Sequence, residues 1–211
     1  LGELRGIGSL RAMSILASRS CPYRCTFCFH PLGNKVRSRS PESVVKEMKT
    51  LHERFGVEMF LFRDELFTTK KSRVHAFCDL LLEGGYDFKW VCNARVDSLD
   101  TEDYRKMRRA GCCNVFFGIE SGSDLILEKM KKRTTVAQAE RAIAAIRKAG
   151  LEPGCSFIFG MEGESAETID ETARFIERNN IYVDRIGFVT PYPGSPIFHE
   201  ALESGRVDDV D

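Results

Sequence analysis

Three cysteines lie close together near the start of the chain, in the stretch SRSCPYRCTFCFHP. Three residues separate Cys21 from Cys25, and two separate Cys25 from Cys28. Thiolates bind soft metals, but a structural zinc site requires four ligands, commonly two CxxC pairs. Three thiolates on one loop can instead hold a 4Fe–4S cluster and leave its fourth iron open to a ligand. We expect Cys21, Cys25 and Cys28 to hold such a cluster, and zinc with a distant fourth ligand is the alternative.

The other cysteines fall singly or as a pair inside apolar stretches, where cysteine is usually a small buried hydrophobe. They are Cys78, Cys92, Cys112, Cys113 and Cys155. A second metal cluster built from them is the less favoured alternative. A chain with a large core does not need disulfides, so we expect a reducing, cytoplasmic compartment.

The composition excludes several classes of partner. The 211 residues include 31 Lys and Arg against 31 Asp and Glu, so no overall charge draws the chain to nucleic acid. No apolar run is long enough for a membrane span, and the start does not resemble a signal peptide. Local basic clusters at 35–39, 105–109 and 129–133 are expected to be solvated cations in loops or at helix ends.

Short apolar runs alternate with amphipathic stretches along almost the whole chain, which predicts alternating strands and helices. Strands are expected near residues 12–17, 57–62, 88–92, 114–117, 154–159 and 185–189. Helices are expected near residues 41–54, 70–83, 101–110, 136–149, 166–178 and 196–203. Ser40 before Pro41, and Thr135 with Gln138, are signals for helix starts.

Six strand–helix units at this spacing imply parallel strands joined by right-handed crossovers. Since a full eight-unit barrel needs about 250 residues, we predict an α/β fold with a partial (β/α)6 TIM-like barrel at 12–200. An open doubly wound sheet is the alternative. Residues 1–11 are expected to be a linker from an N-terminal domain, and 201–211 a polar tail. In either fold the ligand site lies at the carboxyl ends of the strands.

Polar residues follow the second and third strands at this edge. Asp64 and Glu65 follow the second strand, where they could cap a helix or hold an ammonium group. Asn93 and Arg95 follow the third strand, and Arg95 could clamp a carboxylate through a bidentate pair. It could equally pair with Asp64 or Asp97 as part of the scaffold.

The later loops carry weaker signals. FFGIESGS places Glu120 among small residues, where its carboxylate could accept from ribose hydroxyls. SFIFGMEGES contains Gly160, at which exposed backbone could meet the edge of a base. TPYPGSP is a proline-stiffened turn that carries Tyr192.

With these loops, the sequence resembles the radical S-adenosylmethionine (SAM) superfamily. CPYRCTFC matches its CxxxCxxC signature, including the aromatic Phe27 before the last cysteine, and the resemblance runs from about Ala12 to Phe198. It implies a 4Fe–4S cluster whose open iron is chelated by the methionine amino and carboxylate groups of S-adenosylmethionine. It also implies cleavage of that cofactor to a 5′-deoxyadenosyl radical, with flavodoxin or ferredoxin as electron donor and a small molecule as substrate.

The resemblance implies further cofactor contacts by position. Asp64 or Glu65 would hold the amino group, although the usual Gly-Gly-Glu is absent, and GMEGE at 160–164 stands where Gly-Leu-Pro-Gly-Glu is usual. The full set of implied contacts is Phe27, Asp64, Glu65, Asn93, Arg95, Glu120, Ser121, Ile158, Gly160, Thr190 and Tyr192.

Within the superfamily, RSPESVVKEM, CNARVD, FGIESGS and TPYPGSPIF look most like the cobalamin-binding enzymes, which include methyltransferases and a chlorophyll ring cyclase. This likeness implies cobalamin carried by another domain. Alternatives are a methylthiotransferase, a porphyrinogen-oxidase-like enzyme, a non-catalytic zinc module and an inactive barrel. His30 is expected to be an exposed or supporting group, or else a contact to substrate or cobalamin.

Overall fold

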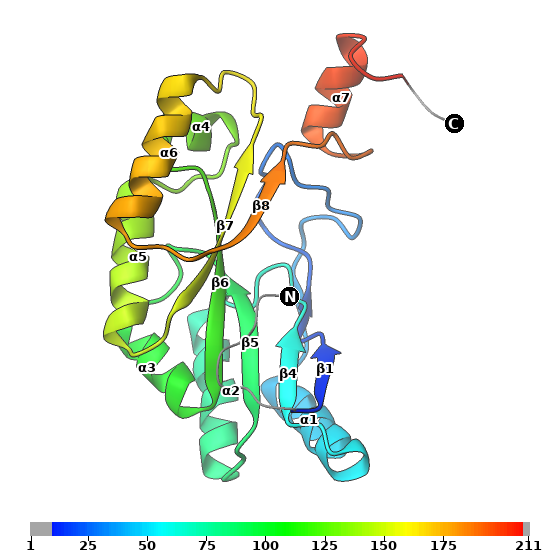
Figure 1. Cartoon of the computed structure of the whole chain (residues 1–211). Helices are drawn as coiled ribbons and strands as arrows, with labels where there is room; N and C mark the ends of the chain where they lie inside the picture. Colours follow the sequence, from blue (N-terminus) through cyan, green and yellow to red (C-terminus); the bar gives the residue numbers. More distant parts are fainter. Residues whose placement is uncertain (1–9, 209–211) are drawn as a thin grey trace.

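The computed structural model describes residues 10–208 and has a parallel sheet at its centre (Figure 1). Its strands, in spatial order, are β1 (Ala12–Ile15), β4 (Met59–Phe62), β5 (Lys89–Ala94), β6 (Cys112–Glu120), β7 (Pro153–Phe159) and β8 (Val183–Phe188). Each strand runs parallel to its neighbours, and the spatial order repeats the chain order. The sheet therefore curls into a half-barrel and does not reverse direction as a doubly wound sheet does, which confirms the predicted fold class.

The helices lie on the convex side of the sheet, apart from α7, which lies near the carboxyl ends of the strands (Figure 1). Those that the sequence predicts are α1 (Pro41–Phe55), α2 (Lys71–Glu83), α3 (Thr101–Arg109), α5 (Val136–Lys148), α6 (Ala166–Arg178) and α7 (Pro196–Glu203). No described helix is both long and apolar enough to cross a membrane.

Three short elements are additional to the prediction. Helix α4 (Asp124–Lys129) follows β6, and an antiparallel pair joins β2 (Ser18–Arg19) to β3 (Arg37–Ser38). These elements are too short to show a periodic pattern in the sequence. The β2–β3 pair closes the base of the loop that contains the three cysteines.

The predicted helix starts are confirmed. The Ser40 hydroxyl accepts from the backbone N–H of Ser43, and Thr135 forms a reciprocal capping box with Gln138. At the other end of α1, Gly56 takes a left-handed conformation with φ of 64°, which costs glycine little.

The main core lies between the convex face of the sheet and the helices. Phe62, Phe67, Phe77 and Trp90 pack with ring centroids 4.7 to 5.9 Å apart. Four of the scattered cysteines are buried in this core, as expected, while Cys113 is half-buried. Burial raises the pKa of Cys155 to about 12, so this thiol stays protonated at neutral pH. Core side chains and helices thus cover the convex side of the sheet, so a ligand can bind only on its concave side.

Candidate active site

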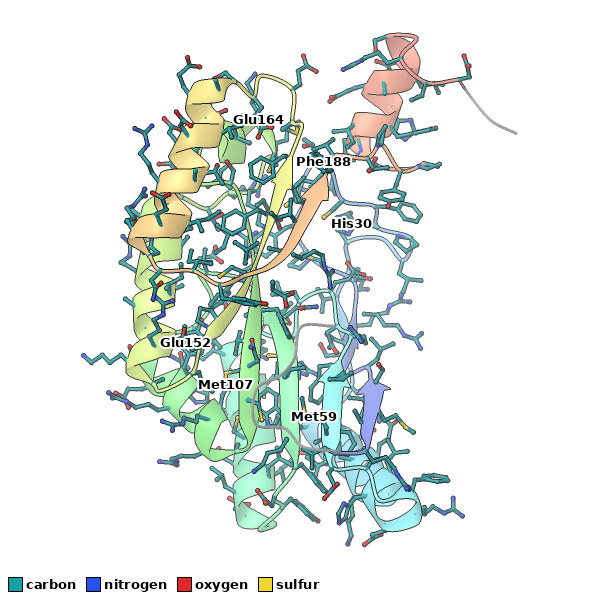
Figure 2. The ribbon with its side chains drawn as sticks, in the orientation of Figure 1. His30, Met59, Met107, Glu152, Glu164 and Phe188 are labelled. Carbon is teal, nitrogen blue, oxygen red and sulfur yellow. The ribbon has the colours of Figure 1, made fainter. Side chains whose placement is uncertain are left out.

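A cavity of about 1890 Å³ occupies the concave side of the half-barrel. The three cysteines line it, and so do polar residues from the carboxyl edge of the strands and the adjoining loops, among them Glu65, Asn93, Arg95, Glu120 and His30. Figure 2 shows His30 near the carboxyl end of β8, away from the side that α5 and α6 cover. The first four strands of the barrel thus bring their predicted loops to one site.

The cysteine loop is held in place by backbone and amide contacts. The Asn34 side chain donates to the carbonyl oxygens of Cys21 and Tyr23, at 3.3 and 2.8 Å. On the other side of the loop, the Thr26 N–H donates to the carbonyl of Met130 at 3.0 Å. These bonds hold the loop through backbone and amide atoms, so the thiols are not needed to fix its conformation and can serve as metal ligands.

The Cys25 and Cys28 thiols interact directly. The hydrogen bond from Cys28 lowers the pKa of Cys25 to about 6, and the positive charges of Lys132 and Arg95 lower it further against the effect of burial. The same bond raises the pKa of Cys28, and burial raises that of Cys21. The lowered pKa favours the thiolate of Cys25, which is the form of cysteine that binds metal.

Polar atoms without partners lie on the same cavity wall as these thiols. Both ring nitrogens of His30 are buried, and neither of them hydrogen-bonds within the described structure. The Nδ1 atom of His30 lies 3.4 Å from Glu65 Oε2, in contact but outside hydrogen-bonding geometry. Buried polar groups normally have partners, so these atoms fit a site that binds an additional polar group beside the thiols.

The geometry also bears on the choice between zinc and a cluster. Among residues 10–208, no three His, Cys, Asp or Glu side chains converge on one position that could hold a single ion. A zinc ion would require such convergence. The thiolates of a cubane each bind a different iron, so a cluster does not require the three thiols to converge on one point.

Asp64 and Glu65 have different environments. Asp64 is fully buried, and its carboxylate accepts from the Ala17 N–H at 3.0 Å and from the Ser18 hydroxyl. It therefore ties the end of β4 to the start of the cysteine loop. Glu65, the next residue, lines the cavity with its side chain 36% exposed. Of the two, Glu65 is the carboxylate that a ligand can reach.

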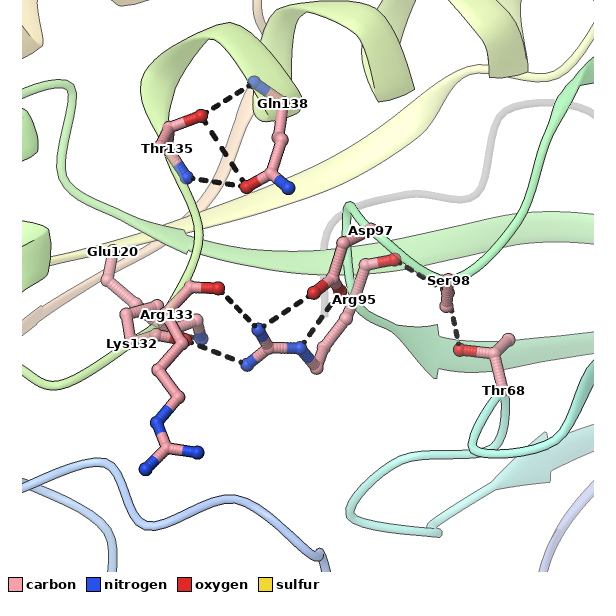
Figure 3. A network of polar contacts seen from close by, with 9 residues as sticks. All are labelled: Thr68, Arg95, Asp97, Ser98, Glu120, Lys132, Arg133, Thr135 and Gln138. Carbon is pink, nitrogen blue, oxygen red and sulfur yellow. Dashed lines mark hydrogen bonds and ion pairs between the residues drawn. The ribbon is translucent and has the colours of Figure 1, made fainter.

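Arg95 makes the scaffold contact that was one of its two expected roles (Figure 3). Its guanidinium forms a bidentate pair with Asp97 at 3.0 and 3.1 Å, and donates to the carbonyls of Lys132 and Arg133 at 3.0 and 3.3 Å. It also lies 3.5 Å above the ring of Tyr23. Four of its five N–H groups are used in this way, which leaves little capacity for a ligand carboxylate.

Lys132 is a site residue that the sequence did not predict. Its ammonium lies 2.7 Å from Glu120 Oε1, both side chains are buried, and both residues line the cavity. The expectation that residues 129–133 are solvated cations is wrong for Lys132. A left-handed backbone at Lys131 and Arg133, with φ of 50° and 56°, accompanies the inward turn of Lys132. Such conformations are uncommon outside glycine and leave no sequence signal.

Asn93 and Ser121 have scaffold contacts. The Asn93 amide donates to the Asp64 carbonyl at 3.0 Å while the residue lines the cavity. Ser121 is buried, and its hydroxyl lies 3.2 Å from that of Thr172 in α6.

The remaining implied contacts lie outside the lining of the large cavity. Phe27 and Ile158 pack, with Val189, against a small apolar cluster formed by Ile126, Met130, Met161 and Ile197. Gly160 has a left-handed φ of 86°, and its N–H donates to the Glu164 carboxylate at 2.6 Å. Thr190 and Tyr192 are exposed on the turn after β8.

Comparison with known proteins shows to which family this chain belongs. The profile of the radical SAM superfamily matches residues 15–176, which is most of the chain. The chain belongs to the radical SAM superfamily. Members of this superfamily bind a 4Fe–4S cluster and S-adenosylmethionine, so the resemblance that rests on CPYRCTFC is confirmed.

Proteins similar to this chain include a methyltransferase and a cyclase. The chain is 33% identical over 190 residues to an uncharacterized methyltransferase of Pyrococcus horikoshii. It is 31% identical over 197 residues to the anaerobic magnesium-protoporphyrin IX monomethyl ester cyclase of Rubrivivax gelatinosus. These matches cover 89% and 92% of this chain, but 41% and 36% of those proteins, so the chain spans less than half their length.

The radical SAM half-barrel is also found in a solved structure. The radical SAM methyltransferase TsrM of Kitasatospora setae, with cobalamin and a 4Fe–4S cluster bound, superposes with a TM-score of 0.82. The match has 23% identity and covers 92% of this chain and 39% of that one. At this identity the likeness establishes the shared fold.

Proposed function

We propose that this chain is the core of an enzyme that binds a 4Fe–4S cluster on Cys21, Cys25 and Cys28 and reductively cleaves S-adenosylmethionine. The observation that carries the proposal is the placement of all three thiols on the wall of one large cavity, with Cys25 already acidic. When bound, the cluster and S-adenosylmethionine together supply a 5′-deoxyadenosyl radical that abstracts hydrogen from a substrate. The residues of the chain bind and orient the reactants and exclude water.

Two ionic side chains are suited to the amino acid part of the cofactor. Glu65 is the reachable carboxylate beside the cysteine loop, and we assign it to the methionine ammonium. Lys132 is a buried cation on the cavity wall, whereas the donors of Arg95 are largely used. We therefore assign the methionine carboxylate to Lys132 in place of Arg95, since buried charge-assisted pairs are the stronger ones.

The remaining residues of the site are suited to the ribose and adenine of S-adenosylmethionine. Glu120 keeps free acceptor capacity beyond its bond to Lys132 and faces the cavity, where it can accept from ribose hydroxyls. Phe27 and Ile158, which pack against the same small apolar cluster, offer a surface for the adenine, and we assign Gly160, Thr190 and Tyr192 to its edge. Deeper in the cavity, Val91 and Phe116 line the wall beneath, where a substrate can lie away from water.

For the whole protein we propose methylation or cyclisation of a small molecule with cobalamin, in the cytoplasm and with flavodoxin or ferredoxin as the source of electrons. Support comes from the methyltransferase and cyclase among its relatives and from the bound cobalamin in the TsrM structure. The cobalamin would be carried by a part of the protein outside this chain.

The proposal is tested by anaerobic reconstitution with iron and sulfide, followed by electron paramagnetic resonance of the reduced protein. Four irons per chain and a cluster signal that changes when S-adenosylmethionine is added are expected, because the cofactor chelates the open iron. The matched variant Cys25→Ala should bind no cluster, whereas Cys113→Ala, which changes a half-buried cysteine on the cavity wall outside the cysteine loop, should bind it fully. Stoichiometric zinc on the wild-type chain, with no cluster, would contradict the proposal.

A further inference from the structure

A second, smaller cavity lies on the opposite side of the cysteine loop. It has a volume of about 530 Å³ and is formed where this loop meets the turn after α4 and the start of α7. Its lining consists of Arg24, Thr26, Glu128, Lys131, Arg133 and Pro196. We call it the basic groove.

The basic groove and the large cavity are separated by a wall that is one chain thick. Tyr23 and Cys25 line the cavity, whereas Arg24 and Thr26, the residues that alternate with them, line the groove. In the facing turn Lys132 lines the cavity, and its two neighbours line the groove. Since consecutive Cα atoms are about 3.8 Å apart, the groove surface lies within one or two residues of two cluster ligands.

Three of the six residues that line the groove are cationic. Arg24, Lys131 and Arg133 are exposed, and their side chains form no hydrogen bond or ion pair with any described residue. Glu128 is the one acidic residue of the lining, so the groove has a net charge of about +2. Figure 3 shows the Arg133 side chain extending away from the Arg95–Asp97 pair.

The wall is rigidly built. The Thr26 N–H donates to the Met130 carbonyl at 3.0 Å, and the Ile197 N–H donates to the Thr26 carbonyl at 3.2 Å. Arg95 fixes the facing turn through the carbonyls of Lys132 and Arg133. The backbone is left-handed at Lys131 and Arg133, a conformation that is strained for residues other than glycine and that clusters at functional sites. The cations are therefore presented on a fixed surface directly behind the thiols.

We propose that the basic groove is the docking surface for a small acidic one-electron carrier protein. The inference rests on the proposed function, which requires an external electron at the cluster. The carrier loses one electron and the cluster gains it, and no atom is transferred. Binding at the groove places the carrier on the outer side of the wall, so that the large cavity stays filled by cofactor and substrate. Unpaired cations on an exposed surface accelerate association with an acidic partner and make it depend on salt.

The test uses flavodoxin, an acidic carrier, and the triple variant Arg24→Gln, Lys131→Gln, Arg133→Gln. The matched control makes the same change in charge at the opposite edge of the sheet. It carries Arg54→Gln, Arg109→Gln and Lys148→Gln, in the last turns of α1, α3 and α5. The affinity of oxidised flavodoxin for each chain is measured by calorimetry between 20 and 300 mM NaCl (about a fourfold range of Debye length). The groove variant should bind at least tenfold more weakly than wild type at low salt and lose most of the salt dependence, and the control should bind within twofold of wild type.

A kinetic readout separates this proposal from the proposed function. Reconstituted chains are reduced either by flavodoxin hydroquinone or by the methyl viologen radical cation. The groove variant should be reduced more slowly by flavodoxin, by at least tenfold, and no more slowly by the viologen, because fewer cations repel it. Equal flavodoxin rates in the groove variant and wild type would overturn the docking proposal even if the cluster is reduced normally by viologen. Failure of every chain to assemble a cluster would instead contradict the proposed function, while the binding measurement would still test the docking surface.

Discussion

Lys132 donates to Glu120 across 2.7 Å inside the cavity, and the two residues lie on either side of α4 in the chain. Glu120 ends β6 with a left-handed φ of 69°, and Lys132 lies beyond α4. The contact also explains Gly118, because a Cβ atom there would lie 2.2 Å from Glu120 Oε1. A buried ion pair contributes little net stability, but removal of one member leaves the other charge unpaired. The pair thus contributes little to folding by itself, in keeping with the proposed binding role of both residues.

Replacement of Lys132 tests this explanation. Lys132→Met should reduce the free energy of unfolding by about 3 kcal/mol, because it leaves the Glu120 carboxylate buried without a cation. The double variant Glu120→Gln, Lys132→Met should be more stable than Lys132→Met alone, since no buried charge remains. Urea unfolding of the metal-free chains measures both. S-adenosylmethionine should bind both reconstituted variants at least tenfold more weakly, and wild-type affinity in the double variant would refute the assignment of Lys132 and Glu120 to the cofactor.

Substitutions at Asp64 and Glu65 should have different effects, one on the stability of the fold and the other on cofactor binding. Asp64→Asn places an amide N–H₂ against one of the two donors from Ala17 and Ser18, and should cost about 2 kcal/mol of unfolding free energy. Glu65→Gln changes a half-exposed side chain and should leave stability within about 0.5 kcal/mol of wild type. The affinity for S-adenosylmethionine should instead fall at least tenfold in Glu65→Gln. If the Asp64→Asn chain is as stable as wild type but binds the cofactor weakly, Asp64 and not Glu65 is the carboxylate that binds the cofactor.

The substitution Arg95→Lys tests whether the Arg95 guanidinium stabilises the fold by joining Asp97 to the turn at Lys132 and Arg133. A lysine cannot form the bidentate pair with Asp97 and reach both carbonyls of the facing turn, so about 2 kcal/mol of unfolding free energy should be lost. Arg185→Lys is the control, since Arg185 also lines the cavity but makes no hydrogen bond or ion pair among the described residues. It should unfold as wild type does. If Arg95→Lys is as stable as this control, Arg95 is available to a ligand after all.

The sequence predicted every large element and the edge of the sheet that holds the site, because strand and helix periodicities and capping residues are local signals. It also placed Cys21, Cys25, Glu65 and Glu120 at that edge. It could not separate Asp64 from Glu65, since the burial of Asp64 depends on a contact with Ala17, 47 residues away. Contacts of this kind depend on tertiary packing and leave no mark in local spacing.

The acidity of Cys25 should be visible in the metal-free chain. Because Cys28 donates to its sulfur, Cys25 has a pKa of about 6, below the ordinary value near 9, so its thiolate persists at neutral pH and is lost as the pH falls through about 6. Alkylation by iodoacetamide, followed at each cysteine by mass spectrometry between pH 5 and 9, should show Cys25 reacting with a midpoint near pH 6. Cys28 and Cys21, whose pKa values are raised, should react only at higher pH. In Cys28→Ala the Cys25 midpoint should move upward, because the donated hydrogen bond is gone, whereas Cys113→Ala should not move it. A midpoint for Cys25 near pH 9 in the wild-type chain would show that the two sulfurs are not hydrogen-bonded before metal binds.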